Sequence, residues 1–180
     1  MKGKTVMTRF SLFKGLGLAL GCAALALTTN SISAADIRAN GGTTWTLEPT
    51  ADPSLFTHTV DGIVQVSLLG NCTVHADVIV HFPANPSQPP TLNGSFTFTT
   101  ADGATTLKAK AEGTGTPDPA NPSFFLNFQY HVTFTGGSGQ FATARGEAEI
   151  KGVALFTSPS AGKATWKMKG QVLEINQGKQ

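Results

Sequence analysis

Hydrophobic and polar residues alternate along most of this chain with a period of two, the pattern of a β-strand that buries one face. In residues 124–134 the even positions are aromatic or aliphatic, and most odd positions are polar. A second alternating run spans residues 142–151, and Gly136, Gly137 and Gly139 lie between the two runs. Glycine adopts positive φ angles without steric cost, so we expect at least one of the three to do so. The segment therefore predicts a β-hairpin with a tight turn.

The same alternation predicts further strands on both sides of this hairpin. They are residues 43–47, 60–69, 72–82, 92–100, 105–114, 153–156 (which extends or follows the second hairpin strand) and 165–175. Gly70-Asn71 and Asp102-Gly103 have the composition of short hairpin turns. Residues 83–90 and 117–122 are rich in proline, which cannot donate to a strand ladder, so both segments predict solvent loops. No amphipathic helix is predicted after residue 35.

Consecutive strands with short connections must each bury one face. We therefore predict an all-β fold, a closed antiparallel up-and-down barrel of about eight strands, because closure removes unpaired edges. An interior of that size is either filled by side chains or able to hold one small ligand. A two-sheet sandwich is the alternative, but its crossovers need longer connections than most of those present.

The first 35 residues predict a signal peptide that is removed from the mature protein. They combine a basic start, an apolar run at 16–27 that is short for a membrane span, and small residues at 33–35. We expect cleavage before Asp36. A lipid-modified Cys22 is the alternative. The sequence thus predicts a secreted or periplasmic protein.

The rest of the chain has the size of one domain. We assign residues 36–59 to an N-terminal extension with a short strand, 60–175 to the barrel and 176–180 to a tail. The leader holds four of the 13 basic residues and none of the 11 acidic ones, so the net charge changes from +2 to −2 on cleavage. A mildly acidic domain gives no reason to expect nucleic-acid binding. Cys72, then the only cysteine, is expected to be a buried thiol; a reactive or intermolecular thiol is the alternative.

Side chains able to bind a metal or to catalyse a reaction are sparse. His75, Asp77 and His81 share one face of a predicted strand, but His75 and His81 are about 20 Å apart at ~3.3 Å per residue. A zinc or copper site would need a partner on another strand, such as His131. A solvated polar face is the simpler interpretation. Ser138 stands in a glycine turn without the signature of a nucleophile, so hydrolase activity is not expected. No metal or other cofactor is predicted.

The glycine turn also carries a family resemblance. The chain reads Gly136-Gly137-Ser138-Gly139-Gln140-Phe141, followed by Ala144-Arg145-Gly146, which resembles the GGTG-x-F-x-x-ARG pattern of plant dirigent proteins. It is also similar to the turn of allene oxide cyclases and of bacterial secreted proteins with an allene-oxide-cyclase-like barrel. The resemblance implies an eight-stranded calycin-type barrel with an internal pocket, often assembled as a homotrimer. Glu147 departs from the dirigent pattern, and no counterpart of the catalytic carboxylate of the cyclases is found.

The strand faces suggest where a ligand would bind. We predict that the even face of 124–134 lines the interior, so that Phe128, Tyr130 and Phe134 contact a small apolar ligand. Small residues on the partner strand, Ala142 to Ala148, are expected to leave a modest cavity. Arg145 is a candidate at the pocket mouth that would stabilise negative charge; an exposed residue paired with Glu147 is the alternative.

These features predict a secreted barrel that binds a small apolar molecule or has a structural role. The alternative is a cofactor-free isomerase or cyclase, or a dirigent-like protein that directs radical coupling. Such an enzyme needs an inward acid, base or cation. The hydroxyl of Tyr130 is the one such group that the predicted inward faces contain.

Overall fold

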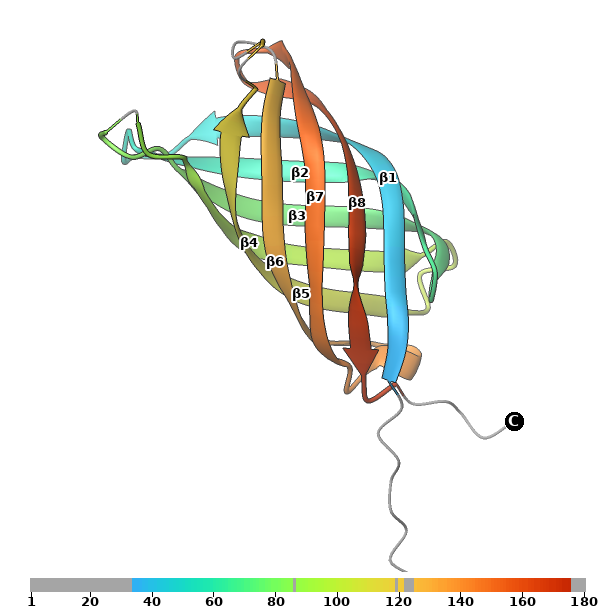
Figure 1. Ribbon diagram of the computed structural model, residues 1–180. Coiled ribbons are helices and arrows are strands. Elements are labelled where there is room, and N and C mark those ends of the chain that lie inside the picture. The colour runs from blue at the N-terminus through green and yellow to red at the C-terminus, as the bar shows by residue number, and fades with distance from the viewer. Residues whose placement is uncertain (1–33, 86, 119, 122–124, 176–180) are drawn as a thin grey trace, which may run out of the picture. The chain divides into compact units, whose positions relative to one another are not determined.

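The computed structural model describes residues 34–175, apart from residues 86, 119 and 122–124. This part of the chain forms eight strands and one 3₁₀ turn: β1 (Ala34–Pro49), β2 (Leu55–Val66), β3 (Gly70–His81), β4 (Thr91–Thr100), β5 (Thr106–Pro117), β6 (Phe125–Gly137), η1 (Gly139–Phe141), β7 (Arg145–Ser158) and β8 (Ala161–Leu173). Each strand pairs antiparallel with the next, and β8 pairs with β1, so the sheet closes into a barrel (Figure 1). The predicted fold class is confirmed, and the sandwich is excluded.

Alternation along each strand builds the core of this barrel. On β3 every second residue from Cys72 to Val80 is buried, and the residues between them are exposed. Cys72 is 2% exposed, and burial raises the pKa of its thiol. Cys72 is therefore an inert core residue, as the simpler interpretation expected.

The segment assigned to an N-terminal extension is part of the barrel. Residues 36–59 supply β1 and the first half of β2, and β1 pairs with both β2 and β8. The sequence signal is weak because inward positions of β1 include Gly41 and Thr43 rather than aliphatic residues. Closure overrides that weak propensity, since without β1 the strands β2 and β8 would be open edges.

Most of the predicted signal peptide lies outside the described residues, as do the tail 176–180 and Phe124. Ala34 and Ala35 are described: they begin β1 and pair with Leu173 and Val172. The expected cleavage point before Asp36 therefore falls inside this strand.

The glycine-rich connection between β6 and β7 is longer than the predicted tight turn. β7 begins at Arg145, so Ala142 lies outside the strand and is exposed, and η1 buries Phe141 completely. Gly136 has a φ of 118° and Gly139 a φ of 58°, which confirms the expectation of positive φ. The extra length lets Phe141 reach the core and close this end of the barrel.

The other connections agree with the predicted turns, with one shift. The β2–β3 turn is formed by residues 67–69, and Gly70, with a φ of 72°, already begins β3. The β4–β5 turn contains Asp102 and Gly103 as expected, and the Asp102 carboxylate accepts a hydrogen bond of 2.6 Å from the Thr100 hydroxyl. The described residues of 83–90 lie between β3 and β4 as expected. The second proline-rich segment differs at its start, because Pro117 ends β5; its described residues 118, 120 and 121 lie between β5 and β6.

The barrel has two ends of different character. The connections β1–β2, β3–β4, β5–β6 and β7–β8 gather at one end, which we call the proline-loop end (Figure 1). The connections β2–β3, β4–β5 and β6–β7 form the other, which we call the Phe141 end. In the part of the chain that the structure describes, no helix is long and apolar enough to cross a membrane.

Candidate functional site

Side chains fill the barrel at the Phe141 end. Phe98, Phe134 and Leu107 are at most 1% exposed. Phe134 on β6 lies between Ala109 of β5 and Gly146 of β7, so a large residue is flanked by small ones. The small residues that were expected to leave a cavity here are thus complementary to β6, and the predicted position of the cavity is wrong.

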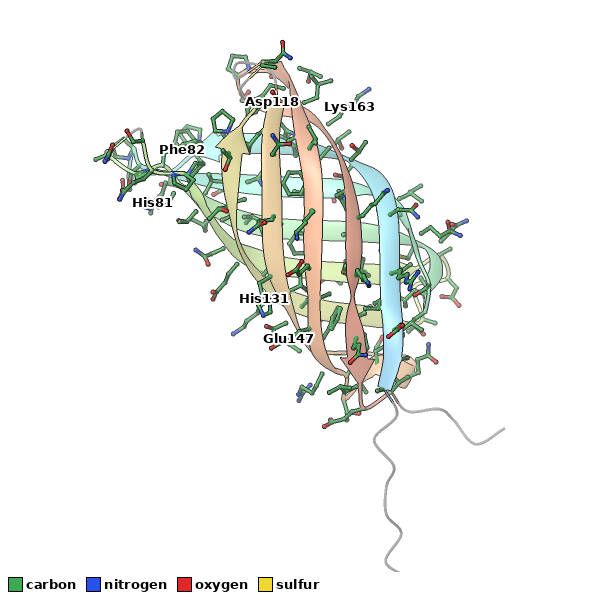
Figure 2. The ribbon with its side chains drawn as sticks, in the orientation of Figure 1. His81, Phe82, Asp118, His131, Glu147 and Lys163 are labelled. Carbon is green, nitrogen blue, oxygen red and sulfur yellow. The ribbon has the colours of Figure 1, made fainter. Side chains whose placement is uncertain are left out.

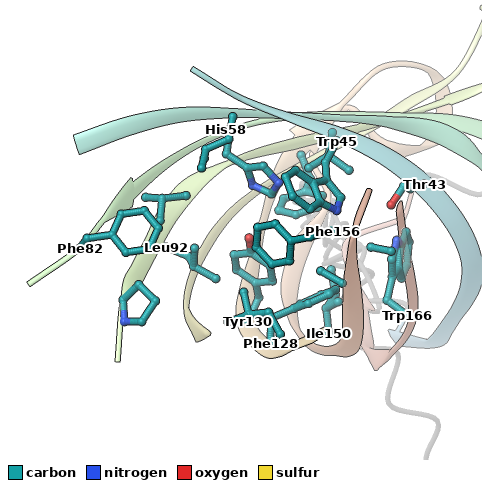
Figure 3. Close-up of a pocket in the computed structure, with 18 residues that line it drawn as sticks. Thr43, Trp45, His58, Phe82, Leu92, Phe128, Tyr130, Ile150, Phe156 and Trp166 are labelled. Carbon is teal, nitrogen blue, oxygen red and sulfur yellow. The ribbon is translucent and has the colours of Figure 1, made fainter. Parts of the chain in front are cut away.

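A cavity of about 100 Å³ lies instead toward the proline-loop end (Figure 3). Its lining comes from every strand except β5 and from the β3–β4 loop, and most of it is aliphatic or aromatic. Ala154 of β7 and Ala164 of β8 supply the small side chains that leave the space. Phe82, which also lines the cavity, is 41% exposed, so the cavity reaches solvent at this end.

Aromatic rings form the wall of this cavity. Tyr130 contacts Phe96 and Phe128 edge-on, with ring centroids 5.5 and 5.8 Å apart. Phe128 pairs with Gly152 on β7, where a Cβ atom would stand 2.5 Å from the Phe128 ring. Glycine at that position therefore makes room for the ring. Two of the predicted ligand-binding residues, Phe128 and Tyr130, line the cavity.

His58 is an inward residue of this cavity that the sequence analysis missed. It is half-buried on β2, yet its Nδ1 atom is fully buried without a hydrogen-bond partner among the described residues. Burial lowers its pKa to about 4, so the imidazole is neutral at pH 7. The available signal was parity: His58 shares the even positions of Phe56, Val60 and Val64. It was overlooked because residues 36–59 were set apart from the barrel.

Two more polar side chains of the lining come from β1. Thr43 is 4% exposed and Trp45 is 5% exposed. The Thr43 Oγ1 and Trp45 Nε1 atoms have no hydrogen-bond partner in the described structure. The Trp45 ring packs edge-on against Phe156 and His58, at centroid distances of 4.8 and 5.6 Å (Figure 3). Unpaired polar atoms and apolar rings therefore share one wall.

The other two predicted ligand-binding residues lie away from the cavity. Phe134 is buried in the filled half of the barrel. Arg145 is exposed at the Phe141 end, where its Nη1 atom donates hydrogen bonds to the carbonyls of Ala144 (2.8 Å) and Thr143 (3.4 Å). The guanidinium thus stabilises the β6–β7 connection and is neither at the cavity mouth nor paired with Glu147.

Three of the four histidines lie on the outer face of the barrel, as the polar-face interpretation expected. His75 Nδ1 is 2.8 Å from Asp61, and burial is too slight to offset this hydrogen bond, so the pKa of His75 is raised. His131 lies 3.8 Å from Glu147 (Figure 2), and His81 is exposed at the end of β3. No group of three acidic, histidine or cysteine side chains within the described ranges is arranged to hold a metal ion.

Ser138 has a structural role in the turn. Its Oγ accepts a hydrogen bond of 2.9 Å from the Thr106 amide and donates one of 3.2 Å to the Ala104 carbonyl. These bonds join the β6–β7 connection to the β4–β5 turn. The hydroxyl is therefore engaged with backbone and is not paired with a histidine as a nucleophile would be.

Comparison with family models, with curated proteins and with solved structures finds no significant match to this chain. The resemblance to the allene oxide cyclase and dirigent barrels therefore stays a prediction.

Proposed function

We propose that this protein binds a small, largely apolar molecule inside the barrel, at the proline-loop end. The observation that carries the proposal is the cavity of about 100 Å³ with an almost entirely apolar wall. A closed apolar space of comparable size, about 150 Å³, takes up benzene in another protein. The enclosed part of this cavity therefore suits one ring or a short chain. Any further part of a larger ligand would extend past Phe82 into solvent.

Apolar area supplies the affinity in such a site. Burial of a ligand surface contributes about 25 cal/mol per Å² removed from water, and the ring walls add contacts of defined geometry. The Phe141 end is packed with buried side chains, so the ligand enters from the opposite end.

His58 supports binding more than catalysis. An isomerase needs a base whose pKa lies near the working pH, and burial holds the pKa of His58 at about 4. Burial also raises the pKa of Tyr130, which keeps its hydroxyl neutral. Both groups are therefore suited to hydrogen bonding with an uncharged ligand rather than to proton transfer at pH 7. A cofactor-free isomerase remains the second candidate, because His58 and Tyr130 are the inward polar groups that it would use.

The signal-peptide pattern supports a location outside the cytoplasm, secreted or periplasmic. A binding protein for an apolar compound would there hold a molecule that is sparingly soluble in water. The homotrimer that the family resemblance implies is a separate prediction, and measurement of the mass in solution would test it.

Titration with ethylbenzene tests the proposed function. We expect saturable binding with one molecule per chain, measured by calorimetry or by NMR shifts of the cavity aromatics. Ala154→Phe places a ring in the cavity and should weaken binding at least about tenfold, a change of ~1.4 kcal/mol. Phe128→Trp, which enlarges the wall on the β6 side, should also reduce binding.

The matched control is Val153→Phe, which adds the same ring one residue earlier on β7. Val153 is exposed on the outer face, so this variant should bind ethylbenzene as the unchanged protein does. Folding of each variant is checked by its thermal transition, and Ala164→Leu serves if Ala154→Phe does not fold. Absence of saturable binding to the folded protein would leave a structural role as the better explanation.

A further inference from the structure

We infer that the ligand is an uncharged molecule with an apolar body and a hydrogen-bond acceptor, such as a ketone, aldehyde or ester, which binds the Trp45 indole N–H and the Thr43 hydroxyl. The inference rests on the proposed function and specifies the ligand of that same cavity. It starts from the unpaired polar atoms of the wall, since a buried donor without a partner is destabilising.

Thr43 and Trp45 are both inward residues of β1, two positions apart, and both line the cavity. Each is at least nine-tenths buried, and each has a polar atom without a partner in the described structure. In a largely apolar wall, two such neighbours form a polar spot without a partner among the described residues. A bound group that accepts both hydrogen bonds would remove the energetic penalty.

The chemistry of these donors determines what the ligand must carry. An indole N–H donates and cannot accept, so its partner must be an acceptor. A carbonyl oxygen has two lone pairs and can accept from the indole and from the Thr43 hydroxyl together. His58, whose unpaired Nδ1 belongs to a ring 5.6 Å from that of Trp45, lies beside the same spot and can donate or accept according to its tautomer.

Charged ligands do not suit the site. No lysine, arginine, aspartate or glutamate is among the described residues that line the cavity. A carboxylate or an ammonium group would therefore lose its hydration without gaining a partner of opposite charge, which is strongly unfavourable. The acceptor must be neutral.

Entry of the acceptor requires a small movement of the wall. The unpaired atoms have almost no exposed area. Phe156, which packs edge-on against Trp45 at 4.8 Å, is only partly buried and stands at an irregularity in the β7–β8 pairing. Its displacement would open a path from the cavity to the indole N–H.

Three small probes of similar shape test the inference: acetophenone, α-methylstyrene and benzoate. Acetophenone has the carbonyl, α-methylstyrene replaces it by a carbon–carbon double bond, and benzoate adds a negative charge. Trp45→Phe removes the N–H and Thr43→Val removes the hydroxyl, with little change in shape. Each variant should weaken acetophenone binding roughly threefold to tenfold and change α-methylstyrene binding by less than about twofold. Benzoate should bind much more weakly than acetophenone at pH 7.

Thr44→Val is the control, because Thr44 is exposed on the outer face of the same strand, and it should leave all affinities unchanged. If Trp45→Phe and Thr43→Val weaken the binding of acetophenone and of α-methylstyrene equally, or weaken neither, the inference is wrong and the apolar binding function stands. Benzoate binding as tight as that of acetophenone would also overturn it. If neither neutral probe binds the folded protein, the proposed function fails, and the inference fails with it. Thr43→Val serves alone if Trp45→Phe does not fold.

Discussion

Lowering the pH from 6.5 to 4 is expected to reduce the free energy of unfolding by about 3 kcal/mol through His58 alone. Burial lowers the pKa of this imidazole from 6.5 to about 4 in the folded protein, whereas the unfolded chain has the ordinary value. Between these two values the unfolded state binds more protons than the folded state. The free energy of unfolding therefore rises with pH across this window. The contribution of His58 is fully present above pH 6.5 and is lost as the pH falls toward 4.

Urea unfolding at a series of pH values measures this effect. His58→Phe should remove the dependence, so the difference in unfolding free energy between the two proteins should itself change by about 3 kcal/mol between pH 7 and 4. His131→Gln is the control, because His131 is exposed on the outer face. His75 acts in the opposite sense, since its pKa is raised and its contribution is lost as the pH rises above 6.5. It is common to all the variants and cancels. A difference that does not change with pH would place His58 in contact with water.

Gly146→Ala is expected to lower the free energy of unfolding by about 2–5 kcal/mol. Gly146 has a φ of 123°, which residues with a side chain rarely adopt, and this strain costs about 1–3 kcal/mol. A Cβ atom would also stand 2.2 Å from the Gln171 carbonyl oxygen on β8, which forces a backbone shift of similar cost. Both effects act where β7 begins.

Gly103→Ala separates the two causes. Gly103 also has a positive φ, 72°, but no atom lies within 4 Å of the position of its missing Cβ. This variant should therefore lose only about 1–2 kcal/mol, the cost of the backbone conformation. Denaturant unfolding of both variants measures the difference. Equal losses would show that the close approach of β8 to Gly146 contributes nothing.

The period-two alternation was sufficient to predict most strands, because each strand buries one face and exposes the other. β3 and β6 illustrate this: the inward residues Val74 to Val80 and Tyr130 to Phe134 were those that the pattern indicated. Closure into a barrel also followed, since eight consecutive strands with short connections have few other ways to pair the backbone groups of the first and last strands. Cys72 was placed in the core by the same parity.

The site was predicted less well, and the reasons are physical. β1 is held in the barrel by pairing with β2 and β8, not by a strongly apolar pattern, so its residues Thr43 and Trp45 were not recognised as part of the interior. His58 on β2 was missed for the same reason, because it lies in the segment 36–59 that was assigned to an extension. The location of the cavity depends on which residues face each other across the barrel, and strand register decides that.

The sequence by itself thus determined the alternation of strands, the loops and the apolar character of the interior, because these depend on local pattern and on glycine and proline. Only the tertiary structure decided where the cavity lies. Ala154 and Ala164 line it, whereas the space beside Ala109 and Gly146 is filled by the Phe134 ring. Only the register of β1 against β2 decides that Thr43, Trp45 and His58 share one wall with unpaired polar atoms. Packing inside the barrel depends on the register of the strands and on the summed volumes of many side chains, and no local period encodes it.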